Sequence, residues 1–212
     1  MELYTYFRST AAYRVRIALN LKGLAWTPHY VSLPKLEHKR PDFLAVNPQG
    51  LLPALRDGSV ELAQSLAILE YLEETHPQPP LLPEGAAARA YVRSLSQVIA
   101  CDIHPLNNLR VLKFLEGRFG LDQAKRLEWY RHWIAEGFRA LEGTIERSGL
   151  AGRFCYGDSP TMADVCLVPQ IFNAERFDCP LEDFPRCLAI RQACDEIEAF
   201  ATAHPAKQPD AA

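Results

Sequence analysis

The 212-residue chain has no apolar run near the ~20 residues needed to cross a bilayer, and no cluster of lysine and arginine. Its formal net charge is −3, so it has no basic surplus with which to attract a nucleic-acid backbone. No charged-then-apolar leader precedes the first predicted strand. We therefore expect a cytoplasmic protein that binds neither membrane nor nucleic acid.

Cysteine is absent from the first 100 residues, and the six cysteines that follow never form a C-x-x-C motif. They share no zinc-ligand spacing with the histidines, so no metal site is predicted. An even count would permit disulfides, but a chain that can bury a full core does not need them. We expect reduced thiols packed as small apolar side chains.

Proline gathers between residues 76 and 85, where four prolines exclude a continuous helix and a central strand. This segment predicts a linker that separates a first domain, residues 1–80, from a second, residues 86–212. The sequence patterns on its two sides differ, which supports a division there.

Strand and helix patterns alternate before the linker. Asp57-Gly58 predicts a hairpin turn, and a helix running to Gly23 follows the first strand. The other predicted elements are Leu3–Phe7, Trp26–Leu33, Pro41–Val46, Leu52–Arg56, Val60–Ala63 and a helix from Gln64-Ser65 through Leu72. The order β-α-β-α-β-β-α is that of a thioredoxin-like α/β domain.

The pattern after the linker is almost entirely helical, so we predict an all-α second domain. Long helical segments are expected over Ala86–Leu115, Leu121–Arg147 and Arg186–Phe200, and Pro105 should kink or break the first. Thr161 and Asp164 have the spacing of a capping box that opens a further helix. The tail from Pro205 is polar and contains prolines, and we expect it to be loose.

The most informative segment is the turn from the first strand into the first helix, at Arg8, Ser9 and Thr10. Backbone N–H groups at a helix start, together with the helix dipole, attract negative charge. A serine there is most often only a helix cap, and no G-x-S-x-G motif supports hydrolase chemistry. Ser9 is instead suited to donate a hydrogen bond to a thiolate, and Arg8 to bind a carboxylate.

Leu52-Pro53 stands at the start of a predicted strand, where proline belongs on an edge or at a bend. If the bond between them is cis, the Leu52 backbone N–H and C=O face outward and can pair with a peptide ligand. The β-α-β-α context favours the cis form over an ordinary trans edge proline.

Gln64-Ser65 stands at the start of the predicted third helix. Ser65 is well placed as the N-cap of that helix. The same helix start is also able to bind the carboxylate of a ligand.

Four further residues are weaker candidates. Arg176 ends a predicted helix and Arg110 follows the predicted helix break, although most arginines at such places are surface charges. His104 lies at that break, where a lone histidine is more often structural than catalytic. His38 is expected to be a solvated loop residue unless a ligand lies across it.

Taken together, these motifs resemble the zeta class of glutathione transferases, and the resemblance covers nearly the whole chain. Its most specific part is the run Arg-Val-Arg-Ile-Ala-Leu at residues 14–19. The other matching stretches are Tyr6–Tyr13, Asn47–Pro53, Gln64–Ile68, Asp102–Asn108, Gly157–Asp164 and Asn173–Phe177.

The resemblance implies that glutathione is the cofactor. Ser9 would hydrogen-bond its sulfur with support from Thr10, and the Leu52 backbone beside Pro53 would pair with its cysteinyl unit. Gln64 and Ser65 would hold its γ-glutamyl end, and His38 and His104 are further contacts to the tripeptide. Arg8, Arg110, Arg176 and Asn108 would bind the substrate.

The implied activity is a cis–trans isomerisation of maleylacetoacetate to fumarylacetoacetate in the breakdown of tyrosine or a related aromatic compound. It would proceed by thiolate addition, bond rotation and elimination, and the class implies a homodimer. Where the class has Ser-Ser-Cys, this chain has Ser9-Thr10-Ala11, so no protein thiol acts there and maleylpyruvate becomes a second candidate substrate. Two competing functions stay open: a general transferase or α-halo acid dehalogenase, and a non-catalytic interaction protein.

Overall fold

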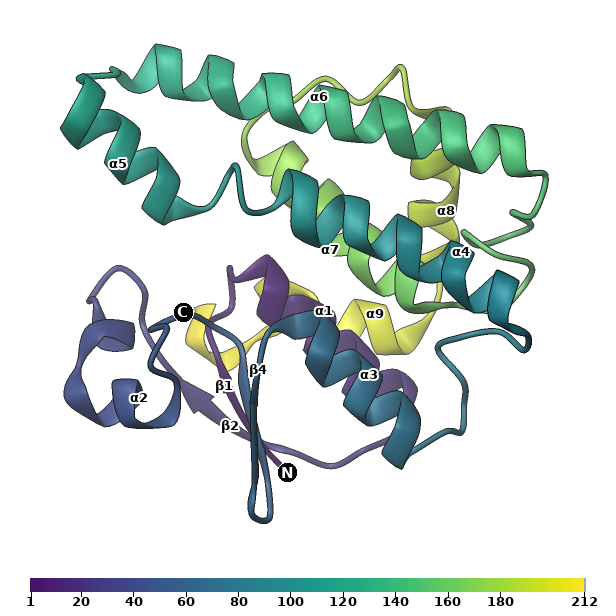
Figure 1. Ribbon diagram of the computed structural model, residues 1–212, viewed down its shortest axis with the longest axis horizontal. Coiled ribbons are helices and arrows are strands. Elements are labelled where there is room, and N and C mark those ends of the chain that lie inside the picture. Colours follow the sequence, from purple (N-terminus) through teal and green to yellow (C-terminus); the bar gives the residue numbers. More distant parts are fainter. Residues whose placement is uncertain (212) are drawn as a thin grey trace. The chain divides into compact units, whose positions relative to one another are not determined.

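The computed structural model describes residues 1–211, which divide into two compact units (Figure 1). The first unit contains Met1–Leu81 together with the C-terminal segment from Asp195, and the second is Leu82–Cys194. The expected boundary inside the proline-rich segment lies close to this division. The expected domain over residues 86–212 differs from it, because the chain returns to the first unit at its end.

A four-stranded sheet forms the centre of the first unit. Its strands are β1 (Glu2–Thr5), β2 (Thr27–Tyr30), β3 (Ala54–Asp57) and β4 (Val60–Ala63), in the order β2-β1-β3-β4. β1 pairs with β2 in parallel, whereas β3 is antiparallel to both β1 and β4. Gly58, at φ 59°, takes the left-handed conformation in the β3–β4 hairpin, which confirms the predicted turn.

Three helices accompany this sheet: α1 (Thr10–Leu21), α2 (Pro41–Val46) and α3 (Ser65–Thr75). Figure 1 shows α1 and α3 beside each other on one side of the strands and α2 on the other side. Residues 10–19 of α1 are all buried, including two arginines. The element order is the predicted β-α-β-α-β-β-α.

A buried ion pair links the end of α1 to α3. The Lys22 ammonium lies 2.9 Å from the Glu73 carboxylate, and both side chains are almost fully buried. Lys22 also donates to the carbonyl oxygens of His76 and Pro79, while Glu73 accepts from the Leu81 N–H. The pair therefore anchors the start of the proline-rich segment to the first unit.

The C-terminal segment is ordered against α1, so the prediction of a loose tail is wrong. Helix α9 (Glu198–Ala203) packs on α1, and the buried Arg16 donates to the Ala203 carbonyl at 3.2 Å. Two 3₁₀ turns follow, over Pro205–Lys207 and Pro209–Ala211. Side-chain hydrogen bonds to the tail account for its order, and composition does not reveal them.

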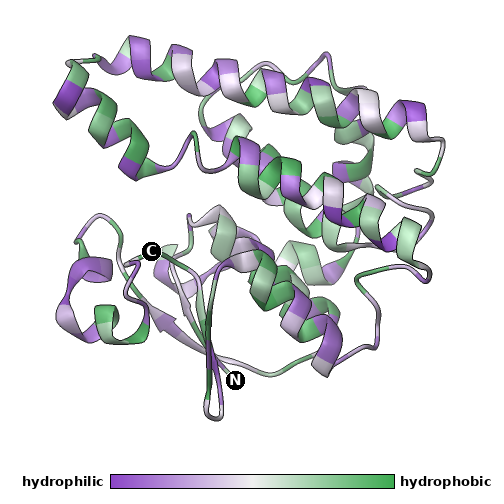
Figure 2. Cartoon of the chain, in the orientation of Figure 1, coloured by the Kyte–Doolittle hydropathy of each residue, from purple (hydrophilic) through white to green (hydrophobic). Residues whose placement is uncertain are grey.

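The second unit consists of helices. They are α4 (Ala86–Gln97), α5 (Leu109–Phe119), α6 (Gln123–Ser148), α7 (Met162–Arg176) and α8 (Pro185–Asp195). Along α6, hydrophilic and hydrophobic residues alternate, as Figure 2 shows. Its buried residues include Tyr130, Ile134, Phe138 and Leu141, spaced at three or four positions, so one face of the helix is in the core.

The expected helix over residues 86–115 changes from α to π geometry before it ends at Pro105. A π-helical stretch, Val98–Ile103, follows α4, and turns lead from it to α5. Gly137 of α6 permits a close approach here, because a Cβ at that position would overlap the Ile103 side chain. The helical backbone thus continues through the π stretch and ends at the turns around Pro105, as predicted.

Buried carboxylates satisfy backbone donors at two helix starts. Thr161 and Asp164 form the predicted capping box of α7, and Asp164 also accepts from the Cys155 N–H at 2.8 Å. Glu142 of α6 accepts from the N–H groups of Arg186 and Cys187 in the first turn of α8. These contacts secure the short helices against the core.

All six cysteines lie among the described residues, and none of them forms a disulfide. Five are buried, and burial raises the pKa of the Cys155, Cys179 and Cys187 thiols. Cys101 is exposed, unlike the expectation for all six. Within residues 1–211, no helix is long and apolar enough to span a bilayer.

Candidate functional site

The sheet register places three of the predicted segments at one edge. Tyr4 pairs with Ala54, which pairs in turn with Ala63. The chain therefore leaves β1, enters β3 and leaves β4 at neighbouring positions. The segments just beyond these positions carry Arg8-Ser9, Leu52-Pro53 and Gln64-Ser65.

Ser9 is the N-cap of α1, as its position predicts. Its Oγ accepts from the Ala12 N–H at 3.2 Å, and its own N–H donates to the Tyr6 carbonyl at 2.9 Å. Capping uses an oxygen lone pair, so the hydroxyl proton is a separate donor. Thr10 is buried and Arg8 is exposed. The first turn of α1 itself contains no acidic residue, so the helix supplies no carboxylate of its own at the positive end of its dipole.

The buried Arg16 holds the turn that precedes Ser9. Its guanidinium donates to Thr5 Oγ1 at 3.0 Å, to the Tyr6 carbonyl at 3.4 Å and to the Phe7 carbonyl at 3.0 Å. Burial lowers the pKa of Arg16 to about 10, while the charge of Asp210 is among the influences that raise it. Arg16 lies within the class-specific run, but its place in the sequence gives no sign of this structural role.

The Leu52-Pro53 bond is cis, and strand pairing begins at the next residue, Ala54. Asn47 shapes the loop before it: its side chain donates to the Leu51 carbonyl at 2.8 Å and accepts from the Gln49 N–H at 3.1 Å. The loop is therefore held by side-chain contacts of its own just outside the sheet.

Gln64 adopts a φ of 71°, a conformation that residues other than glycine rarely take. Its side-chain amide donates to Gln49 Oε1 at 2.9 Å, which joins this position to the loop before Leu52. Strain of this kind costs on the order of 1–3 kcal/mol and clusters at functional positions.

Ser65 is the first residue of α3 and does not cap it, so the predicted capping role is wrong. Gln64 occupies the cap position without a side-chain cap bond. The Ser65 hydroxyl instead accepts from Nη1 of the buried Arg14 at 3.1 Å. This contact ties the start of α3 to α1 and leaves the N-terminal backbone of α3 without its own side-chain cap.

His38 belongs to the 3₁₀ turn Glu37–Lys39 and is buried, so the expectation of a solvated loop residue is wrong. The backbone of Gly50 approaches closely, because a Cβ at Gly50 would lie 2.8 Å from the His38 carbonyl oxygen. The His38 turn thus packs on the loop that leads to Leu52.

Arg176 is the last residue of α7, where a cation also favours the helix dipole. Its guanidinium lies 4.8 Å from the centroid of the Phe177 ring, and that ring stacks on Tyr130 with 4.0 Å between centroids. The Tyr130 hydroxyl donates to Asn173, which also accepts from Gln170 at 3.4 Å. Burial raises the pKa of Tyr130, which therefore remains neutral.

The sequence does not predict this stack. The periodicity of α6 predicts only that Tyr130 lies on the buried face of the helix. Nothing in that pattern indicates a contact with the residues next to Arg176. The Asn173–Phe177 motif carries the only usable signal, because it contains an amide, an arginine and an aromatic within five residues.

The other candidates of the second unit lie around the break before α5. Asn108 caps α5 by accepting from the Arg110 N–H at 3.1 Å, and the Arg110 side chain is exposed. His104 follows the π turn, and its N–H donates to the Ile99 carbonyl at 3.0 Å. These three candidates thus lie at the turns between the π stretch and the start of α5.

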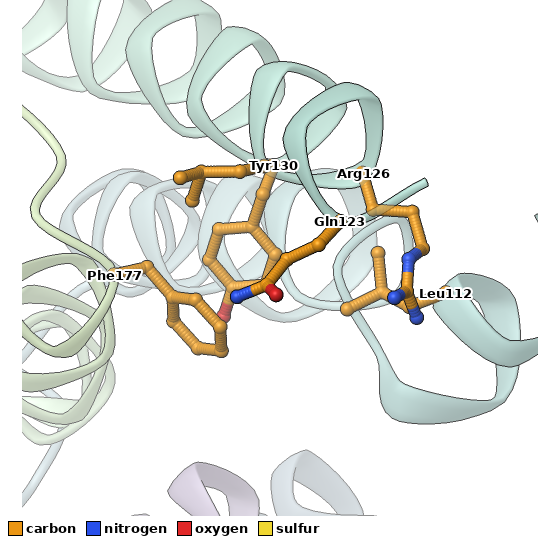
Figure 3. A pocket seen from close by; sticks show the side chains of 6 residues that line it. Leu112, Gln123, Arg126, Tyr130 and Phe177 are labelled. Atoms are coloured by element: carbon orange, nitrogen blue, oxygen red, sulfur yellow. The ribbon is translucent and has the colours of Figure 1, made fainter. Parts of the chain in front are cut away.

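A hollow of about 220 Å³ opens beside Tyr130 and Phe177 (Figure 3). Leu112 of α5 and Leu127 of α6 add apolar walls, and the polar lining consists of Gln123 and Arg126. Arg126 is paired with Glu116 at 2.6 Å, so its charge is largely balanced. The hollow suits a small, mainly apolar group.

Comparison with known proteins places this arrangement among described enzymes. Residues 3–80 match the family described as "Glutathione S-transferase, N-terminal domain". The maleylpyruvate isomerase of Ralstonia sp is 47% identical over 212 residues, which is 100% of both chains.

Two solved structures have closely similar folds. One is a maleyl pyruvate isomerase described as a bacterial zeta-class glutathione S-transferase, with a TM-score of 0.98, 47% identity and full coverage of both chains. The other is a maleylacetoacetate isomerase from Methylobacterium extorquens with bound malonate and GSH, with a TM-score of 0.97, 45% identity and full coverage of both.

Proposed function

The chain belongs to the zeta class of glutathione transferases, and we propose that it isomerises a maleyl compound to its fumaryl form with glutathione as cofactor. Maleylacetoacetate is the proposed substrate, converted to fumarylacetoacetate in the catabolism of tyrosine or a related aromatic. One observation carries the proposal: the register that brings Ser9, Leu52 and Ser65 to one edge of the sheet.

The residues at this edge fit a tripeptide with a thiol. The start of α1, which has no acidic residue, suits a sulfur anion. The backbone of Leu52 lies just before β3, where its N–H and C=O can pair with the backbone of a peptide ligand. The start of α3 has no side-chain cap, so its backbone donors suit a carboxylate. The sulfur, the peptide backbone and one carboxylate of glutathione thus each have a complementary group in the first unit.

When bound, glutathione supplies the thiolate that adds to the double bond and is later expelled. Ser9 donates a hydrogen bond from its hydroxyl to the sulfur, and Thr10 supports the helix start. Leu52, next to Pro53, pairs through its backbone with the cysteinyl unit. Gln64 and Ser65 hold the γ-glutamyl end, while His38 and His104 contact the tripeptide.

Four residues act on the substrate in this proposal. Arg8 and Arg176 bind its carboxylate and oxo groups, and Arg110 and Asn108 assist. Both Arg8 and Arg176 are exposed, so they are accessible to an anionic ligand. Negative charge grows on the carbonyl oxygen as the double bond becomes single, and cations positioned there lower the barrier.

Maleylpyruvate is the second candidate substrate. The Ralstonia relative of that name matches the full chain, and Thr10-Ala11 departs from the Ser-Ser-Cys pattern of the class. We further propose a cytoplasmic homodimer, as the class implies.

The test is an absorbance assay of both maleyl substrates with and without glutathione. Turnover only in its presence is the expected result, and the ratio of kcat/KM values identifies the preferred substrate. Robust turnover without any thiol would overturn the mechanism. Faster conjugation of an aryl halide or dechlorination of an α-halo acid would favour a general transferase, and failure to bind glutathione in calorimetry would favour an interaction protein.

A further inference from the structure

The C-terminal tail contacts the turn that carries Arg8 and Ser9. The Phe7 N–H donates to Asp210 Oδ2 at 2.9 Å, across a separation of 203 residues. β1 ends at Thr5, so the sheet supplies no partner for this N–H. The carboxylate of Asp210 is therefore the acceptor for a backbone donor two residues before Ser9.

Arg16 holds the opposite end of the same residue. Its Nη2 donates to the Phe7 carbonyl at 3.0 Å, so both backbone polar groups of Phe7 are bound by charged side chains. Asp210 and Arg16 also attract each other electrostatically. Hydrogen bonds to charged groups are stronger than neutral ones, so the two residues restrict the turn from two sides.

The tail itself is positioned by contacts within the first unit. Gln208 donates to the carbonyl oxygens of Thr202 and His204, at 2.9 and 3.2 Å. The His204 ring packs edge-on against Tyr13 of α1, with 6.1 Å between centroids. Thr202 belongs to α9 and Tyr13 belongs to α1. The tail that carries Asp210 is therefore fixed by contacts with these two helices.

We propose that Asp210 is a positioning residue, which fixes the backbone of residues 6–9 so that Arg8 and Ser9 are presented to an anionic ligand. This inference rests on the proposed function, because it concerns the turn that would hold the glutathione sulfur. The turn consists of the four residues 6–9 between β1 and α1, and it is closed by the bond from the Ser9 N–H to the Tyr6 carbonyl. Loss of the Asp210 contact leaves the Phe7 N–H without its acceptor and removes one of the two charged side chains that restrict the turn.

The experiment compares Asp210→Ala and Asp210→Asn with wild type. Glu198→Gln is the matched control, because it removes a carboxylate from the same C-terminal segment at an exposed position. Three quantities are measured well below the unfolding temperature. They are the Kd for glutathione by calorimetry, the thiol pKa of bound glutathione from thiolate absorbance, and hydrogen exchange of the Phe7 amide by NMR.

We expect the Kd of Asp210→Ala for glutathione to be about five- to tenfold higher than that of wild type. A rise of this size corresponds to a turn that adopts the binding conformation only about a fifth to a tenth of the time. The thiol pKa should rise, and the Phe7 amide should exchange faster. Asp210→Asn keeps an acceptor and should lie between Asp210→Ala and wild type. The direction of the pKa change is diagnostic, because removing a negative charge by itself would lower the pKa of a nearby thiol.

Two failures are distinguishable. If wild type does not bind glutathione, the proposed function fails and takes this inference with it. If wild type binds but Asp210→Ala matches Glu198→Gln in thiol pKa and in Phe7 exchange, the positioning role is overturned while the function stands. A fall in thermal stability with unchanged thiol pKa would likewise overturn it, because that is the signature of a purely structural contact.

Discussion

Replacing Ser9 with alanine tests the proposed thiolate site most directly. The substitution removes two interactions at once: the cap to the Ala12 N–H, seen at 3.2 Å, and the hydrogen bond that the hydroxyl is proposed to donate to the sulfur. The α1 dipole remains, because the backbone of the first turn is unchanged.

The expected size follows from the strength of these interactions. A hydrogen bond to a charged acceptor contributes about 1.5–3 kcal/mol. One pKa unit corresponds to about 1.36 kcal/mol, so the thiol pKa of bound glutathione should rise by about one to two units in Ser9→Ala. Loss of the cap should separately lower the free energy of unfolding by about 1 kcal/mol.

The assay is a pH titration of thiolate absorbance in the complex, with urea unfolding in parallel. Asp122→Ala is the matched control, because Asp122 caps α6 through the Lys125 N–H at 2.9 Å and its loss has a similar stability cost. Ser9→Thr keeps a hydroxyl and should keep the low pKa. A thiol pKa in Ser9→Ala equal to that of wild type would refute the proposed role of Ser9.

Three other outcomes are expected. Arg176→Ala should lower kcat about 10- to 100-fold while changing the Kd for glutathione less than about twofold, measured against Arg147→Ala at the end of α6; equal effects of both variants would contradict a substrate role. Glu73→Gln should lower the free energy of unfolding in urea by about 3–5 kcal/mol, because its buried lysine partner loses its counter-ion, whereas the exposed Glu74→Gln should have little effect. Burial raises the pKa of Cys179 to about 11, so the unfolded thiol ionises first and stability should be undiminished below pH 9 and fall from pH 9 to 11. That fall should be smaller in Cys179→Ala, and an identical pH dependence of the urea midpoint would show that Cys179 does not contribute.

Short-range sequence signals predicted their structures well. Asp57-Gly58 forms the hairpin turn, Thr161 and Asp164 form the capping box, and Ser9 caps α1. In each case the partners lie within a few residues of one another, so the local sequence contains the whole interaction.

Predictions that ignored distant partners were wrong. The Ser65 hydroxyl accepts from Arg14, 51 residues away, and does not cap α3. The tail was expected to be loose, yet Asp210 binds Phe7 across 203 residues. A hydroxyl or carboxylate has the same local pattern whether or not a donor arrives from elsewhere in the chain, so only the fold decides its role.

The sequence alone determined the order of strands and helices in the first unit and the class to which the chain belongs, because these depend on periodicity, turn residues and short motifs. The tertiary structure decided how the turn before Ser9 is held and how Arg176 is stacked. Phe7 is held by Arg16 and Asp210, and Arg176 packs against Phe177, which stacks on Tyr130. The Phe7–Asp210 and Tyr130–Phe177 contacts join residues far apart in the chain, so they form only when the elements that carry them have folded together.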